Sequence, residues 1–118
     1  MSFAFEDLNV YKKALDFSVA VIKIVDDLDT PGKHYRMIEQ LEASSSSVAL
    51  NIAEGKGRFS KKEFKHFCYI ARGSLYETIA ILQIFKKMNW LKEEQYLNLY
   101  DDSVEIGKMI SGLIKSIK

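Results

Sequence analysis

The 118-residue chain is long enough for a single hydrophobic core, and we expect one domain over residues 1–118. Only one proline and six glycines interrupt a sequence that is 47% hydrophobic and lacks alternating apolar patterning, which favours an all-α fold over any sheet. Seventeen basic and sixteen acidic residues leave a net charge of +1, which excludes the strong overall basicity of an obligate nucleic-acid binder.

The first predicted helix runs from about Asp7 to Leu28, because apolar residues recur there at three- and four-residue steps. Pro31 and Gly32 predict the loop that follows. The expected inward face comprises Leu8, Tyr11, Leu15, Ser18, Val21, Val25 and Leu28, and is widened by Val10, Ala14, Phe17 and Ile24.

The second predicted helix spans about Lys33 to Glu54 and contains four consecutive serines, Ser44 to Ser47. Serine forms helices poorly, but its small side chain lets a neighbouring helix approach, and its hydroxyl can bond back to a helix carbonyl. We therefore expect tight packing here. The expected inward residues are Tyr35, Ile38, Leu41, Ser45, Val48, Ala49 and Ile52.

A turn with two glycines should join the second helix to the third. Gly55 is the predicted C-cap, since Gly55 and Gly57 can adopt the positive φ angles that helix ends use. Ser60 and Glu63 match a reciprocal capping box, so the third helix should begin near Lys61.

Two polar residues near this turn, Asn51 and Glu54, are assigned structural roles. Asn51 would pack at the end of the helix, and Glu54 would hold Arg58 or backbone amides across the turn.

The third predicted helix, from about Lys61 to Met88, carries two apolar lines. The core line is Phe64, Phe67, Cys68, Ala71, Leu75, Ile79, Leu82 and Phe85, and the second line is Ile70, Ile81, Ile84 and Met88. One bundle core cannot cover both, so the second line predicts a subunit interface and hence a homo-oligomer. Gly73, in the middle of this helix, is expected to permit close packing against the four serines.

The fourth predicted helix starts at about Glu93. Its expected inward residues are Leu97, Tyr100, Val104, Gly107, Ile110, Ile114 and Ile117. Four helices joined by short loops predict an antiparallel, up-and-down four-helix bundle.

The turn motif resembles a family signature. The matching residues are Asn51-Ile52-Ala53-Glu54-Gly55, Gly57-Arg58, Ser60-x-x-Glu63-Phe64, Leu8-x-Val10-Tyr11, Gln40-Leu41, Ser47 and Ile70-Ala71-x-Gly73-Ser74. In these the chain resembles the 23S ribosomal RNA intervening-sequence proteins, also called four helix bundle proteins. One departure is Glu42-Ala43, where the family pattern carries two arginines.

The resemblance implies a bundle assembled as a homo-oligomeric ring, a pentamer, with no known enzymatic activity. A relative, the accessory variability determinant protein of diversity-generating retroelements, binds nucleic acid and a reverse transcriptase. The resemblance therefore points toward RNA or DNA, and toward a reverse transcriptase as a candidate protein partner.

Basic residues concentrate around the predicted turn. Residues 54–65 contain five basic and two acidic side chains, whereas residues 92–105 contain one basic and five acidic ones. Lysines in the first turn of a helix oppose its dipole, and a bound phosphate would offset that cost. The candidate nucleic-acid-binding residues are Lys56, Arg58, Lys61, Lys62 and Lys65.

Two readings of this basic cluster without nucleic acid stay open. The helix end can simply be solvated, or the lysines can pair with the acidic segment 93–105 of a neighbouring subunit. The second reading gives an alternative function, a ring that acts as a protein-interaction scaffold.

No catalytic, metal or cofactor site is predicted. Glu63-x-x-His66 has the spacing of di-iron bundles but occurs once, and Cys68 lies among the core residues of its helix. The absence of a leader-like start and of an apolar run of ~20 residues leads us to expect a cytoplasmic protein without membrane contact.

Overall fold

The computed structural model describes residues 2–30 and 34–118. A short 3₁₀-helix, η1 (Ala4–Asp7), precedes four α-helices: α1 (Asn9–Val25), α2 (Tyr35–Lys56), α3 (Lys61–Lys87) and α4 (Glu93–Ser116). No strand occurs in this described part of the chain, so the predicted all-α, four-helix fold is confirmed.

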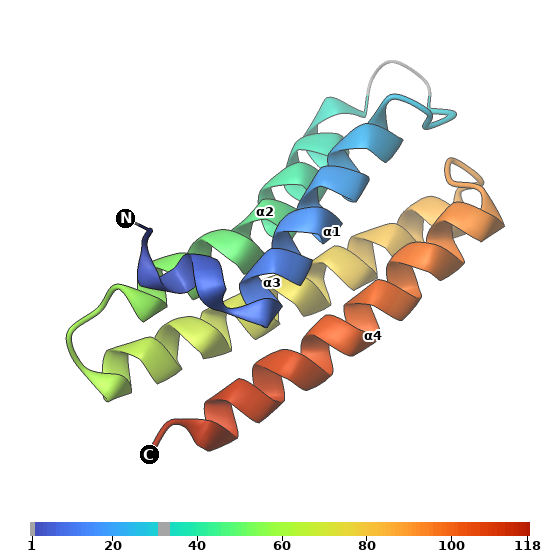
Figure 1. The fold of residues 1–118 in the computed structure, drawn as a ribbon. Helices are drawn as coiled ribbons and strands as arrows, with labels where there is room; N and C mark the ends of the chain where they lie inside the picture. The colour runs from blue at the N-terminus through green and yellow to red at the C-terminus, as the bar shows by residue number, and fades with distance from the viewer. Residues whose placement is uncertain (1, 31–33) are drawn as a thin grey trace.

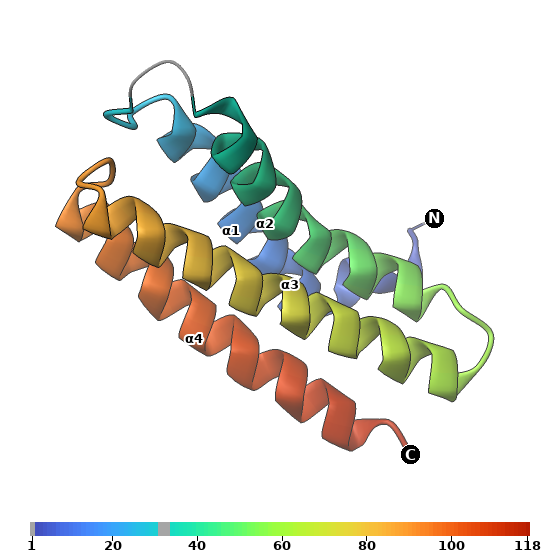
Figure 2. The ribbon, with the colours of Figure 1, turned by 180° about the vertical axis from the view of Figure 1, so that it is seen from behind.

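The helices form an elongated bundle of 46 × 23 × 23 Å (Figure 1). α2 packs most extensively on α3, while α1 contacts α2 and α4 and lies diagonally across the bundle from α3. Seen from behind, the α2–α3 turn and the C-terminus lie at one end of the bundle, and the α3–α4 turn lies at the other (Figure 2). This up-and-down order brings the end of α4 beside the α2–α3 turn.

The helix boundaries differ most from the predicted ones in the N-terminal half of the chain. α1 begins at Asn9 because the preceding residues form η1, and it ends at Val25. α3 begins at Lys61 and α4 at Glu93, as predicted. The predicted loop residues Pro31 and Gly32, and the predicted helix start Lys33, lie outside the described residues.

Small hydroxyl side chains join α2 to α3. The Ser44, Ser45 and Ser46 hydroxyls each donate to the carbonyl three residues earlier. The Ser47 and Ser74 hydroxyls are 2.8 Å apart, and the Thr78 hydroxyl donates to that of Ser44 over 2.8 Å. The predicted tight serine packing against the middle of α3 is confirmed.

The predicted inward face of α4 is wrong in its first half. Leu97, Tyr100 and Val104 are 48%, 39% and 39% exposed. The core instead receives the stripe one residue earlier, which comprises Tyr96, Leu99, Ser103 and Ile106. Because both stripes are largely apolar, periodicity alone did not distinguish the core face from the outer one.

Other helices show smaller differences of the same kind. Leu15 of α1 and Tyr35 of α2 were expected inside and are exposed. Ile81 was assigned to the outer line of α3, yet it is buried, whereas Ile70, Ile84 and Met88 of that line are exposed as predicted.

Gly55 is not the C-cap of α2. The helix continues through Lys56, and its C-cap is Gly57 at φ −79°; no described glycine has a positive φ. Gly55 is instead buried where α2 meets α3. A Cβ added to it would lie 2.6 Å from the Cβ of Phe67, which is closer than any real pair of such atoms. Glycine is required here for close approach and not for backbone conformation.

Gly73 has no such neighbour. A Cβ added there would meet no heavy atom within 4 Å, and the residue is exposed. The prediction that Gly73 permits close packing is wrong, because the next residue, Ser74, makes the contact with α2.

The two glycines provide a matched pair for mutagenesis. Gly55→Ala should lower the free energy of unfolding by about 1–3 kcal/mol, because the added methyl group overpacks the contact with Phe67. Gly73→Ala should raise it by about 0.5–1 kcal/mol through helix propensity alone. Urea unfolding at one protein concentration measures both. A stabilised Gly55→Ala variant would contradict the close-approach role.

Candidate nucleic-acid interface

The α2–α3 turn is held by a serine cap. The Ser60 hydroxyl accepts a bond of 3.0 Å from the Glu63 backbone N–H, as predicted. The predicted reciprocal bond is replaced by another, because the Glu63 carboxylate accepts from the Ser60 hydroxyl at 3.3 Å. Serine capping therefore fixes the start of α3 at the residue after Ser60.

Arg58 is bound within the turn. Its guanidinium lies 2.7 Å from the Glu54 carboxylate and 3.8 Å from that of Glu63, and stacks 4.8 Å from the centre of the Phe67 ring. The predicted Glu54–Arg58 pair is confirmed. Both acidic residues of the turn are thus occupied by its one arginine, which makes Arg58 a brace between α2 and α3.

The lysines of the turn keep their charge uncompensated. Within the described residues, no carboxylate forms an ion pair with Lys56, Lys61, Lys62 or Lys65. The Lys56 ammonium lies 5.4 Å above the centre of the Phe64 ring. Lys61 and Lys62 are exposed in the first turn of α3, and Lys65 is half-buried one turn later.

The end of α4 adds a further cation. Lys56, Lys61 and Lys118 line one open pocket of ≈ 380 Å³ together with the apolar residues Phe64, Leu113 and Ile117. Sequence reasoning missed Lys118, although the up-and-down topology alone places the C-terminus of α4 beside the α2–α3 turn. We call Lys56, Lys61, Lys62 and Lys118 the lysine tip.

Phe59 stands at the same tip and was also missed. Its side chain is 105% exposed, the highest value among the large hydrophobic residues of the described chain. It directly precedes the serine cap of α3.

Asn51 and Gly57 have structural roles. The Asn51 amide donates 2.8 Å bonds to the Ser47 carbonyl and hydroxyl, so it supports the serine contact with α3 and not the turn itself. The Gly57 N–H bonds to the carbonyls of Ala53 and Glu54 and closes α2.

The acidic segment 93–105 forms the first half of α4, which starts at the end of the bundle away from the lysine tip (Figure 2). Two of its carboxylates already have partners in the same chain. Glu93 lies 3.7 Å from Lys86, and Glu105 lies 2.9 Å from Lys13, whose pKa it raises by accepting a hydrogen bond.

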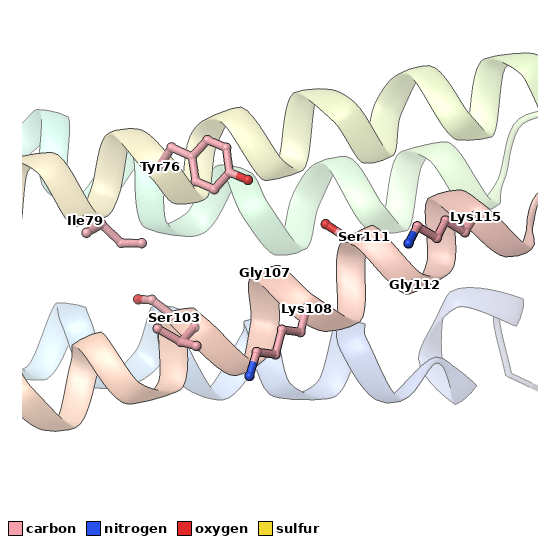
Figure 3. Close-up of a pocket in the computed structure, with 9 residues that line it drawn as sticks. Tyr76, Ile79, Ser103, Gly107, Lys108, Ser111, Gly112 and Lys115 are labelled. Carbon is pink, nitrogen blue, oxygen red and sulfur yellow. The ribbon is translucent and has the colours of Figure 1, made fainter.

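A groove of ≈ 500 Å³ runs between α3 and α4 (Figure 3). Gly107 and Gly112 leave its α4 wall low, while the Tyr76 ring rises from α3 and the Lys108 and Lys115 side chains extend from α4. Val104 also lines the groove, continuing the exposed stripe of Leu97 and Tyr100. A second exposed apolar stripe, on α1, consists of Leu15, Val19 and Ile22, each 44% exposed.

The reactive side chains offer little chemistry. Cys68 is fully buried, and burial raises the pKa of its thiol to about 11, so it packs as a small hydrophobic residue, as predicted. Across residues 2–30 and 34–118, no group of three or more His, Cys, Asp and Glu side chains is placed to hold a metal ion. None of the described helices has the length and apolar character needed to span a bilayer.

Comparison with known proteins shows a family match and several similar solved structures. The model of the 23S rRNA-intervening sequence protein family matches residues 6–112. A protein of unknown function from the S23 ribosomal protein family of Bacteroides thetaiotaomicron VPI-5482 has a similar structure, with a TM-score of 0.84 and 29% sequence identity. The similarity covers 91% of this chain and 99% of that one. Among curated proteins, none matches the chain.

The serine cap can be tested against a second serine. Ser60→Ala should lower the free energy of unfolding by about 1 kcal/mol, because it leaves an N–H of α3 without its partner. Ser46→Ala should change the free energy of unfolding by only about 0.3 kcal/mol, since alanine suits a helix interior. Urea unfolding compares the two variants, and equal effects would show that the cap does not hold the turn.

Proposed function

The chain belongs to the family of 23S rRNA-intervening sequence proteins, and from this premise we propose that it is a non-enzymatic, cytoplasmic accessory protein that binds RNA or DNA phosphates. Binding occurs at the lysine tip of a homo-oligomer. The uncompensated lysines of that tip are the observation that carries the proposal.

Electrostatics at the tip favour an anion. Lys61 and Lys62 occupy the first turn of α3, where the helix dipole is positive, and Lys56 and Lys118 add like charges from α2 and α4. The carboxylates nearest in sequence, Glu54 and Glu63, are bound to Arg58. A phosphate would relieve this accumulation of positive charge and could accept bonds from the exposed N–H groups of the helix start. Of the predicted cluster, Arg58 therefore acts as the brace of the turn. Lys56, Lys61 and Lys62 contact phosphate at the lysine tip, and Lys65 lies half-buried one turn further along α3.

One tip alone supplies few contacts, and the net charge of the chain is only +1. Several tips on one assembly would bind the same strand together, because the second contact becomes intramolecular. The proposal therefore requires self-association, which the outer faces of the bundle support.

Besides the exposed α3 line of Ile70, Ile84 and Met88, two further apolar faces, the α1 stripe and the α3–α4 groove, can serve contacts between copies. Lys13 pairs with Glu105 of α4, so its side chain lies on the side of α1 that faces α4. Successive residues of a helix are rotated by about 100°, which places Val19 about 120° around α1 from Lys13. The α1 stripe and the α3–α4 groove thus point in different directions. Two unlike faces suit a heterologous contact, which closes into a ring when the rotation permits, and the family resemblance implies five copies.

The alternative is a ring that recruits a protein, such as a reverse transcriptase, without binding nucleic acid. In that case the lysine tip would pair with the acidic segment of a neighbouring copy. Glu93 and Glu105 of that segment already have lysine partners in their own chain, which leaves Glu94, Asp101 and Asp102 for the contact. This observation favours nucleic acid over charge pairing between subunits.

Charge reversal at the tip separates binding from folding. Lys61→Glu with Lys62→Glu should weaken binding to a single-stranded RNA by more than about tenfold at about 50 mM salt, because phosphate contacts are lost. The same changes should stabilise the fold slightly, since acidic residues suit the start of α3. Fluorescence anisotropy measures binding, and urea unfolding measures stability.

The control is Lys87→Glu with Lys92→Glu, which alters net charge equally at the α3–α4 end of the bundle. This variant should retain most of the affinity. If both double variants lost the same affinity for RNA, binding would depend only on the net charge of the protein and not on the lysine tip. Absence of binding by the wild type at low salt would leave the scaffold as the function.

The proposed self-association has its own test. Light scattering should give the wild type a mass several times 13.6 kDa. Val104→Arg should reduce that mass to 13.6 kDa, since the variant would bury an unpaired guanidinium in the contact. Leu50→Arg, on the exposed face of α2, should keep the wild-type mass. A wild-type monomer, or an intact Val104→Arg oligomer, would contradict the proposed contact.

A further inference from the structure

Phe59 occupies a position where an apolar side chain normally packs against its own helix. It lies one residue before the N-cap Ser60, and in a hydrophobic staple this residue contacts the fourth residue of the helix, here Phe64. The staple is not formed, because Phe59 is 105% exposed. The Lys56 ammonium lies over the Phe64 ring instead, at 5.4 Å. No described contact within the chain accounts for an aromatic ring at this position.

The surroundings of Phe59 define what could cover it. Lys61 and Lys62 follow it closely in the chain, and Lys56 precedes it by three residues, all without carboxylate partners among the described residues. The arginine beside it, Arg58, is turned to Glu54 and Glu63. A partner must therefore offer a flat apolar surface and negative charge within a few ångströms of each other.

A single-stranded nucleic acid has this combination in every nucleotide. An unpaired base presents a face for stacking, and its phosphate presents the charge, whereas the bases of a duplex are stacked on one another and offer no face to an outside ring. A lipid surface fits less well, because the first three residues of α3 are charged and the apolar side chains nearby, Phe64, Leu113 and Ile117, are partly buried.

We infer that Phe59 is a stacking platform for an unpaired base, so that the α2–α3 turn selects single-stranded over double-stranded nucleic acid. This inference rests on the proposed function and narrows its ligand. Phosphates bind the lysine tip, and one base of the same strand stacks on Phe59. In an oligomer the platform recurs once per subunit, and binding requires no particular sequence, since every base has a face to stack.

The test uses the full chain, a mixed-sequence single-stranded RNA of 20 nucleotides and a duplex of the same length. Wild-type protein should bind the single strand more tightly. Phe59→Ala should weaken binding to the single strand by about five- to one-hundred-fold, as expected for one stacked base, and should leave duplex binding unchanged. Phe59→Trp should restore the affinity, and Tyr35→Ala, which removes another exposed aromatic ring from the start of α2, should have no effect.

A fluorescent base reports stacking directly. A strand containing 2-aminopurine should change its emission on binding the wild type and not on binding Phe59→Ala. Unchanged single-strand affinity in Phe59→Ala, together with weak binding by the Lys61 and Lys62 double variant, would overturn the inference and leave phosphate binding intact. Equal losses for strand and duplex, or a reduced oligomer mass in Phe59→Ala, would also overturn it. No binding by the wild type to either nucleic acid would remove the proposed function itself.

Discussion

The close approach of α2 to α3 is the constraint on which the rest of the molecule depends. At one end Gly55 lets the backbone of α2 come so near Phe67 that no β-carbon fits between them. Further along, Ser47 meets Ser74 and Ser44 meets Thr78 through 2.8 Å hydrogen bonds. Small residues at these positions hold the second half of α2 close to α3, and this fixes where their connecting turn projects from the bundle.

The electrostatics of the tip follow from that geometry. Because α2 and α3 are held close, Arg58 can reach Glu54, Glu63 and the ring of Phe67 together. The brace uses both carboxylates of the turn and leaves the lysines without partners. The same up-and-down order returns Lys118 to this end of the bundle. An almost neutral chain thereby carries, at one end, four lysines without carboxylate partners among the described residues, while the acidic residues of α4 lie toward the other end.

The sequence allowed the four helices, the Ser60 cap and the serine contact to be predicted, because each depends on local spacing or on residue size. It did not allow the outward face of α4 to be identified, since Leu97 and Tyr100 begin an apolar stripe only one residue from the buried stripe of Tyr96 and Leu99. A glycine at position 55 is consistent both with a helix C-cap and with close packing between helices. Only the position of Phe67 in the structure shows that close packing is its role. Phe59 was not predicted as a site residue, because an apolar residue just before a helix normally packs against that helix. Only the three-dimensional structure shows that its side chain is exposed.

The salt dependence of binding shows whether several lysine tips of one assembly hold nucleic-acid phosphates. The slope of log affinity against log salt counts the phosphates neutralised, at about 0.7 per contact for a single strand. With the oligomer mass fixed by light scattering, we expect a slope larger than the four lysines of one tip can supply, that is, steeper than about 3. An affinity that does not change with salt, or no binding by an intact oligomer at low salt, would contradict phosphate binding by several tips and would favour a protein partner instead.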